Sequence, residues 1–310
     1  MTDHSNTPQK KTSKTFGFVA LIGPPNAGKS TLMNHMIGQK VAITSRKPQT
    51  TRHRILGIKT TDEAQIVFVD TPGIHAAGKR ELNKMINKTA INSMEDVDLI
   101  LFMMDDRGWS PEIELAFAAI GQPKVPVFLL INKVDKLRDK KALLPLIETV
   151  KSRYDFAQII PISAQQIKDT NALWETLVKA LPKDDLGYGF PVGQITDKSQ
   201  RFLASELVRE QIFRQLGQEL PYATAVEVLE FTVDEGNFIS TDMVIWVDRD
   251  GQKGIIVGKK GAKLKEIGTR AREQMQAMFG VRVNVTLWVK VRKGWADNAR
   301  MLKSLGYTEL

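Results

Sequence analysis

The chain of 310 residues carries 44 Lys and Arg against 35 Asp and Glu, a net charge of +9, and its apolar and charged fractions are those of a globular protein. Cysteine is absent, which excludes disulfide scaffolds, thiolate metal sites and cysteine nucleophiles. No apolar run approaches the ~20 residues that cross a bilayer, and the polar first residues do not resemble a secretory signal. We therefore expect a cytoplasmic protein of about two domains.

The excess positive charge is concentrated in one segment of the chain. Between Gly251 and Lys293 stand eleven basic and two acidic residues, so this segment alone accounts for the net charge. Such a surface either binds polyanions or is a solvated face of the fold, and charge alone leaves both interpretations open.

Apolar runs alternate with helical patterns in the first 182 residues. In chain order we expect strand 16–22, helix 29–38, strand 65–69, helix 81–94, strand 99–104, helix 112–120, strand 127–131, helix 141–153, strand 159–162 and helix 172–181. This alternation predicts an α/β domain over 15–182, with a mostly parallel sheet covered on both faces. Residues 1–14 are expected to form a flexible basic tail.

The order of elements changes after residue 182. Residues 183–196 contain Gly and Pro with little periodicity and predict a linker. Residues 197–310 predict a smaller α+β domain with a C-terminal tail. Its expected elements are helix 199–216, strand 225–233, strand 243–247, helix 262–278 and strand 282–290.

The first predicted strand is followed at once by GPPNAGKS, residues 23–30, which matches the phosphate-binding pattern GxxxxGK[ST]. Backbone N–H groups of such a loop wrap the phosphates, while the lysine reaches the outer phosphates and the serine hydroxyl binds Mg²⁺. The helix that begins there directs its positive end at the anion. The residues predicted to contact the nucleotide are Gly23, Asn26, Ala27, Gly28, Lys29, Ser30 and Thr31.

A second motif, DTPG, follows the strand expected at 65–69. The Asp70 carboxylate can hold Mg²⁺, and the N–H of Gly73 can meet a γ-phosphate; Thr71 and Pro72 complete the loop. Asp, Pro and Gly are also ordinary turn residues, so the motif alone favours a turn, and its place in the series of motifs supports the site.

Two further strand ends predict recognition of guanine. In Asn132-Lys133-Val134-Asp135, the Asp135 carboxylate can accept hydrogen bonds from N1–H and the 2-amino group of guanine, a donor pair that adenine lacks. Asn132 would brace the loop and Lys133 would cover the purine. Ser163 and Ala164 would complete the pocket with a backbone N–H.

In this order, GPPNAGKS, DTPG, NKVD and SA resemble the motifs of translation-factor-type GTPases, and SRKPQTTRHR at 45–54 resembles the first switch of the Era GTPases. The resemblance implies that Thr51 contacts Mg²⁺ together with Ser30 and Asp70, with Thr50 as the alternative. It also implies GTP and GDP as ligands.

The catalytic candidates are Lys29, Thr51, Gly73 and Asn26. Ras-type GTPases orient the attacking water with a glutamine just after this second motif, where the present chain has Ile74. In related GTPases an asparagine at the position of Asn26 accompanies a bound potassium ion, which implies slow, potassium-stimulated hydrolysis. A plain loop role for Asn26 is the alternative.

Within the basic segment, Gly258-Lys259-Lys260-Gly261 is the GXXG signature of KH domains. Two glycines let a nucleic-acid backbone lie against the loop, and the helix that follows favours phosphate. The residues predicted to bind RNA are Lys253, Gly258, Lys259, Lys260, Gly261, Lys263 and Lys265. A solvated helix face is the alternative for Lys263 and Lys265.

The stretches ITDKSQRF, ELPY, GQK and LWVKV with the following GW resemble the C-terminal half of the Era GTPases, here a type II-like KH domain. The resemblance implies binding to the 3′ end of 16S ribosomal RNA, assistance in 30S subunit maturation, and peripheral association with the inner membrane. We expect a monomer. The competing interpretations are a constitutive RNA-binding protein with a structural GTP site, and a tRNA-modification or large-subunit GTPase.

Overall fold

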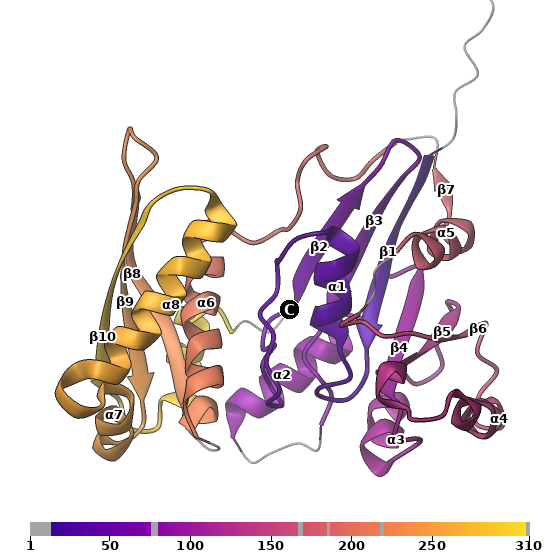
Figure 1. The fold of residues 1–310 in the computed structure, drawn as a ribbon, viewed down its shortest axis with the longest axis horizontal. Coiled ribbons are helices and arrows are strands. Elements are labelled where there is room, and N and C mark those ends of the chain that lie inside the picture. Colours follow the sequence, from indigo (N-terminus) through magenta and orange to yellow (C-terminus); the bar gives the residue numbers. More distant parts are fainter. Residues whose placement is uncertain (1–13, 76–79, 167–169, 185–186, 218–219, 308–310) are drawn as a thin grey trace, which may run out of the picture.

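The computed structural model describes residues 14–75, 80–166, 170–184, 187–217 and 220–307, which form two units side by side (Figure 1). The first unit runs from strand β1 (Lys14–Ile22) to strand β7 (Lys183–Asp184). The second runs from helix α6 (Gln200–Gln215) to helix α9 (Ala299–Ser304). In Figure 1, α6 and α8 lie between the small sheet of the second unit and the first unit.

The first unit is built on a sheet of seven strands in the order β2-β3-β1-β4-β5-β6, with β7 paired to β1. Strands β1, β3, β4, β5 and β6 are parallel to their neighbours in this set, whereas β2 and β7 pair antiparallel. The remaining strands are β2 (Ile55–Thr60), β3 (Ala64–Asp70), β4 (Leu99–Asp105), β5 (Val127–Asn132) and β6 (Gln158–Pro161). The predicted mostly parallel sheet is confirmed.

Helices cover both faces of this sheet, because its strands are apolar on both sides. Residues of α1 and α5 pack into one buried cluster, and residues of α2, α3 and α4 pack into the cluster on the opposite face. Their bounds are α1 (Lys29–Ile37), α2 (Glu81–Asn92), α3 (Pro111–Ala118), α4 (Leu143–Lys151) and α5 (Asn171–Ala180). Two 3₁₀ turns complete the unit: η1 (Val134–Lys136) and η2 (Lys140–Ala142).

Three features of this unit differ from the sequence prediction. Strand β2 is not predicted from the sequence, because Gly57 and Lys59 interrupt its apolar pattern; its whole length pairs with residues 65–70 of β3. Lys14, assigned to the tail, begins β1, while residues 1–13 lie outside the described part of the chain. The predicted linker is bonded to the sheet at both ends, through β7 and through the carbonyl of Ile195, which accepts from Ile58 N.

The second unit has the expected α+β composition. Strands β8 (Thr224–Val233), β9 (Ile239–Val247) and β10 (Val283–Val291) form a sheet in the order β10-β9-β8, with β10 parallel and β8 antiparallel to β9. Helices α6 and α8 (Ala262–Phe279) pack with the sheet in one buried cluster. The 3₁₀ turns are η3 (Leu220–Ala223), η4 (Lys259–Gly261) and η5 (Trp295–Asp297).

Two helices of this unit were not expected from the sequence. The apolar run before the GXXG sequence is the last turn of helix α7 (Asp250–Val257), whose pattern Gly251 and Gly254 obscure. Short helix α9 follows η5. Within the described part of the chain, no helix is sufficiently long and apolar to span a membrane.

Apolar side chains from both units meet in a shared cluster. Leu82 and Ile86 of α2 pack with Trp295 of η5 and with Leu302 and Tyr307 at the end of the chain. Trp295 is 1% exposed and donates through Nε1 to the carbonyl of Ala223. The two units are therefore joined by a buried apolar contact.

Candidate functional site

The four motifs of the first unit lie at one edge of its sheet. The phosphate loop follows β1, Asp70 is the last residue of β3, Asn132 is the last residue of β5, and Ser163 follows β6. These strands are parallel and adjacent or separated by one strand, so their carboxyl ends meet. Open α/β sheets bind ligands at this edge.

The phosphate loop depends on glycine where other parts of the site approach its backbone. Gly28 has φ of 108°, and a Cβ there would lie 2.1 Å from Nδ2 of Asn132. Lys29 is 6% exposed, and its Nζ donates to the carbonyls of Gly23 and Pro24 at 3.0 Å each. Burial lowers the pKa of Lys29 to about 8, an effect that the charge of Asp70 partly offsets. The loop therefore concentrates N–H groups and one desolvated ammonium, as phosphate binding requires.

Three oxygen-bearing side chains predicted to hold Mg²⁺ are in mutual contact. Ser30 Oγ donates to Oδ2 of Asp70 at 2.6 Å and lies 2.9 Å from Oγ1 of Thr51. Burial raises the pKa of Asp70 to about 6, against the opposing effects of the Ser30 hydrogen bond and the Lys29 charge. Its Oδ1 is buried and has no hydrogen-bond partner among the described residues. This unpaired oxygen and the neighbouring hydroxyls fit a hard cation.

The alternative metal ligand, Thr50, lies differently. Its Oγ1 donates to the carbonyl of Lys47 at 2.7 Å and contacts Oγ of Ser45 at 2.6 Å. The Thr51 hydroxyl therefore faces Ser30, whereas the Thr50 hydroxyl is hydrogen-bonded within its own turn.

The DTPG loop packs closely on the phosphate loop. A Cβ on Gly73 would lie 2.7 Å from both N and Cα of Pro25, so only glycine fits without displacing backbone. Thr71 is buried and donates through Oγ1 to the carbonyl of Leu21 at 2.8 Å. Ile74 is buried at 4% exposure, which leaves no polar group at that position.

Asn132 joins the predicted guanine pocket to the phosphate loop. Its Nδ2 donates to the carbonyl of Ala27 at 2.7 Å, and its Oδ1 accepts from the backbone N of Lys133 at 2.7 Å and of Ala164 at 2.8 Å. The exposed Asp135 carboxylate accepts from Oγ of Ser163 at 2.5 Å. The predicted base-binding residues thus form two hydrogen-bonded sets, Asn132 with Lys133 and Ala164, and Asp135 with Ser163.

Sequence reasoning missed Asp105, the last residue of β4. Its carboxylate accepts from Nζ of Lys133 at 3.3 Å and from Nε of Arg107 at 2.8 Å. Burial raises its pKa, but the hydrogen bonds from Arg107 and the charge of Lys133 outweigh burial and leave the pKa below its ordinary value. Asp105 directly follows a predicted strand, as Asp70 and Asn132 do, and this position in the sequence is the feature from which it could have been predicted.

The GXXG loop of the second unit connects α7 to α8. Gly258, Lys260 and Gly261 have φ of 71°, 51° and 79°, and a Cβ on Gly258 would lie 2.7 Å from Cβ of Lys263. The side chains of Lys259 and Lys260 are exposed. The sharp turn therefore presents two ammonium groups at the start of a helix of 18 residues.

The other lysines predicted to bind RNA divide into two groups. Lys253 and Lys265 are exposed and make no ion pair among the described residues. Lys263 is partly buried and its Nζ donates to Glu266 at 3.1 Å, so part of its charge is compensated.

Two family models match the chain, one for each unit. A model described as "50S ribosome-binding GTPase" matches residues 18–133, and a KH domain model matches residues 219–296. The chain is 50% identical to GTPase Era of Stenotrophomonas maltophilia (strain K279a), a match over 94% of this chain and 97% of that protein. It is 48% identical to GTPase Era of Pseudomonas fluorescens (strain Pf0-1), over 95% and 97%. The chain belongs to the Era GTPases.

Solved Era structures support this assignment over both units. An Aquifex aeolicus Era variant bound to GDP·AlF₄⁻ superimposes with a TM-score of 0.90 at 40% identity, covering 94% of this chain and 99% of that one. Era in complex with MgGDPNP and nucleotides 1506–1542 of 16S ribosomal RNA gives the same TM-score and identity, covering 95% and 99%. The predictions of family, fold and GTPase activity are confirmed.

Proposed function

We propose that this Era GTPase is a GTP-driven switch that binds 16S ribosomal RNA near its 3′ end and assists maturation of the 30S subunit. The observation that carries the proposal is the similarity, over both units, to the Era complex with MgGDPNP and 16S ribosomal RNA. The convergence of four nucleotide motifs in one unit and the exposed lysine loop in the other supports it.

In this proposal the first unit holds GTP through the residues at its sheet edge. The backbone of Gly23–Ser30 and the Lys29 ammonium bind the phosphates. Asp135 accepts both guanine donors, Lys133 covers the base, and Ala164 donates its N–H. The hydrogen bonds of Asn132 to Ala27, Lys133 and Ala164 keep the phosphate and base pockets at a fixed separation.

Ser30, Thr51 and Asp70 would hold Mg²⁺, and Asp70 Oδ1 has no other described partner. When bound, Mg²⁺ neutralises charge on the β- and γ-phosphates. The Gly73 N–H orients the γ-phosphate, and Lys29 stabilises the charge that develops on it. Since Ile74 is apolar and buried, the side chain after DTPG positions no water.

The second unit binds RNA through its GXXG loop. Lys259 and Lys260 meet phosphates of a single strand whose backbone lies against Gly258 and Gly261. The exposed Lys253 and Lys265 extend the positive surface beside this loop.

We place the protein in the cytoplasm; its peripheral association with the inner membrane and its monomeric state stay predictions.

Single-turnover GTP hydrolysis, with and without an RNA that carries the 3′ end of 16S ribosomal RNA, tests the switch. We expect cleavage of GTP to GDP and phosphate, with a rate that changes when this RNA binds. A scrambled RNA of equal length is the control. RNA binding without any turnover would instead identify a constitutive RNA-binding protein with a structural GTP site.

We further propose that Asn26 contributes to a potassium site beside the phosphates. Its side chain is exposed at the rim of the phosphate loop, and its φ of 62° holds it there. If Na⁺ does not occupy this site, replacing K⁺ by Na⁺ is expected to slow hydrolysis on the order of 10²-fold, as removal of one group that stabilises the transition state does, with nucleotide affinity in Mg²⁺ unchanged. Equal rates in the two salts, measured at equal ionic strength, would reduce Asn26 to a loop residue.

A further inference from the structure

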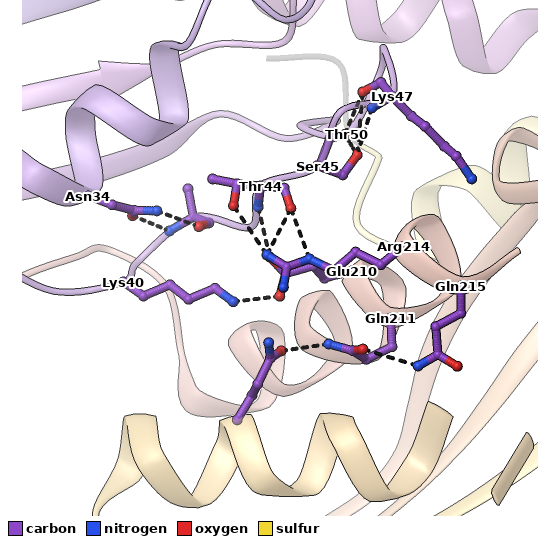
Figure 2. Close-up of polar contacts among 12 residues, drawn as sticks. Asn34, Lys40, Thr44, Ser45, Lys47, Thr50, Glu210, Gln211, Arg214 and Gln215 are labelled. Atoms are coloured by element: carbon purple, nitrogen blue, oxygen red, sulfur yellow. Dashed lines mark hydrogen bonds and ion pairs between the residues drawn. The ribbon is translucent and has the colours of Figure 1, made fainter. Parts of the chain in front are cut away.

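The segment that carries Thr51 is bonded to helix α6 of the second unit. The Glu210 side chain is fully buried; its Oε1 accepts from the backbone N of Thr44 at 3.0 Å and its Oε2 from Nζ of Lys40 at 2.5 Å. Figure 2 shows this carboxylate between Lys40, Thr44 and Arg214. Lys47 Nζ donates to the carbonyl of Leu216, at the end of the same helix. Helix α6 and the residue that follows it thus bind residues 40–47, the part of the chain that precedes Thr50 and Thr51.

A second residue of α6 reaches the peptide bond that precedes Thr51. Arg209 Nη2 donates to the carbonyl of Thr50, while its Nε and Nη2 donate to the two oxygens of Glu206 at 2.7 and 2.5 Å. Arg209 is 2% exposed and Glu206 is 4% exposed. A buried guanidinium fixed by a carboxylate on the preceding turn is a rigid donor.

The residue that follows Thr51 is held from the second unit as well. Arg52 is 1% exposed; its Nη1 donates to the carbonyl of Thr224 at 2.9 Å and its Nη2 to the carbonyl of Pro221 at 3.0 Å. Thr51 therefore lies between a backbone carbonyl and an arginine side chain that are both held by the second unit, with its hydroxyl 2.9 Å from Oγ of Ser30.

We propose that Arg209 is a positioning residue for the nucleotide site, supplied by the RNA-binding unit, which sets the Thr51 hydroxyl in reach of the metal. The inference rests on the proposed function only in assigning Mg²⁺ to Ser30, Thr51 and Asp70. The hydrogen bonds of Arg209 to described residues run to Glu206 and to the carbonyl of Thr50, and none of them reaches Ser30, Asp70 or the Thr51 hydroxyl. Arg209 fixes the carbonyl of Thr50 and so restricts rotation of the peptide plane between Thr50 and Thr51 about ψ of Thr50 and φ of Thr51.

The arrangement makes the two units depend on each other. If the contact of Arg209 with Thr50 favours the metal-bound position of Thr51, then metal binding favours that contact to the same extent. A displacement of α6 is expected to weaken Mg²⁺ binding without altering the guanine pocket, whose hydrogen bonds among the described residues stay within the first unit.

The test compares Arg209→Lys with wild type, Thr51→Ala and the double variant. A lysine keeps a positive charge beside Glu206, so the helix is expected to fold, but one ammonium cannot reproduce the guanidinium fork that reaches both Glu206 and Thr50. Arg201→Ala is the matched control, since Arg201 lies on the same helix and donates to the carbonyls of Val228 and Leu229 inside its own unit.

The readouts are the Mg²⁺ concentration at half-maximal single-turnover hydrolysis and the affinity for GDP without Mg²⁺. We expect Arg209→Lys to raise the Mg²⁺ requirement about tenfold, with GDP affinity unchanged and no further effect in the Thr51→Ala background. The control is expected to match wild type in both readouts.

Three results would overturn the proposal. One is a wild-type Mg²⁺ requirement in Arg209→Lys while Thr51→Ala raises it. Another is an effect of Arg209→Lys that adds in full to that of Thr51→Ala. The third is a Thr51→Ala variant with a normal Mg²⁺ requirement, which would also remove Thr51 from the proposed metal site and so locate the failure in the proposed function.

Discussion

Replacing Asp135 by asparagine is expected to transfer the preference of this GTPase from guanosine to xanthosine nucleotides. The carboxylate accepts two hydrogen bonds from guanine, and each hydrogen bond to a charged group contributes about 1.5–3 kcal/mol. Asparagine keeps one acceptor oxygen for N1–H but turns an NH₂ donor toward the 2-amino group, so one of the two hydrogen bonds is lost and GTP affinity falls on the order of 10- to 10²-fold. An amide presents a donor where xanthine has a carbonyl, so XTP affinity rises.

Equilibrium titration with fluorescent GDP and XDP measures this exchange. Asp139→Asn is the matched control, because Asp139 is an exposed carboxylate four positions further along that caps η2 by accepting from Lys141 N. We expect this control to keep wild-type affinities. Unchanged GDP affinity in Asp135→Asn would show that Asp135 does not bind guanine and that the guanine pocket lies elsewhere.

Much of the nucleotide site could be predicted because most of its residues stand directly after strands, and the strands can be located from the sequence. Each motif follows a short apolar run, and the ends of parallel strands must meet at one edge. The order of the motifs along the chain is therefore sufficient to predict that Lys29, Asp70 and Asn132 lie together. The residue that is not at a strand end, Thr51, was named from the resemblance to Era GTPases, and the structure places it against Ser30.

The contacts between the units could not be predicted in the same way. Glu206, Arg209 and Glu210 look like the polar face of an amphipathic helix, yet all three are buried against a segment about 160 positions earlier in the chain. Arg209 and Glu206 pair within the helix, whereas Glu210 also pairs with Lys40, 170 positions earlier in the chain. Strand β2 and helix α7 could not be predicted for a local reason. Gly57 interrupts the apolar pattern of the strand, and Gly251 and Gly254 interrupt that of the helix.

Reversing the charge of the GXXG loop is expected to cause the largest loss of RNA binding. Lys259→Asp combined with Lys260→Asp places two carboxylates where phosphates pass, and like-charge contacts cost several kcal/mol. We expect RNA affinity to fall on the order of 100-fold, and the slope of log K against log [salt] to flatten by about 1.4, since each single-strand phosphate contact contributes about 0.7. Both side chains are exposed, so folding and GTP binding persist.

Lys140→Asp combined with Lys141→Asp is the matched control for this double variant. These lysines are also adjacent and exposed, and they lie in η2 of the first unit, so the change in net charge is the same. Titration of both variants at several salt concentrations separates a local phosphate contact from the overall charge of the protein. Equal losses in the two variants would show that net charge alone attracts RNA.

The proposed function requires that this GTPase holds 16S ribosomal RNA through the GXXG loop of its second unit. Cross-linking the protein to RNA in cells, followed by sequencing of the bound fragments, tests it most directly. We predict fragments from the 3′ end of 16S ribosomal RNA with the wild-type protein and with the η2 control, and their loss with Lys259→Asp, Lys260→Asp. Enrichment of other RNAs, or the same 3′-end fragments from the GXXG variant, would contradict the account.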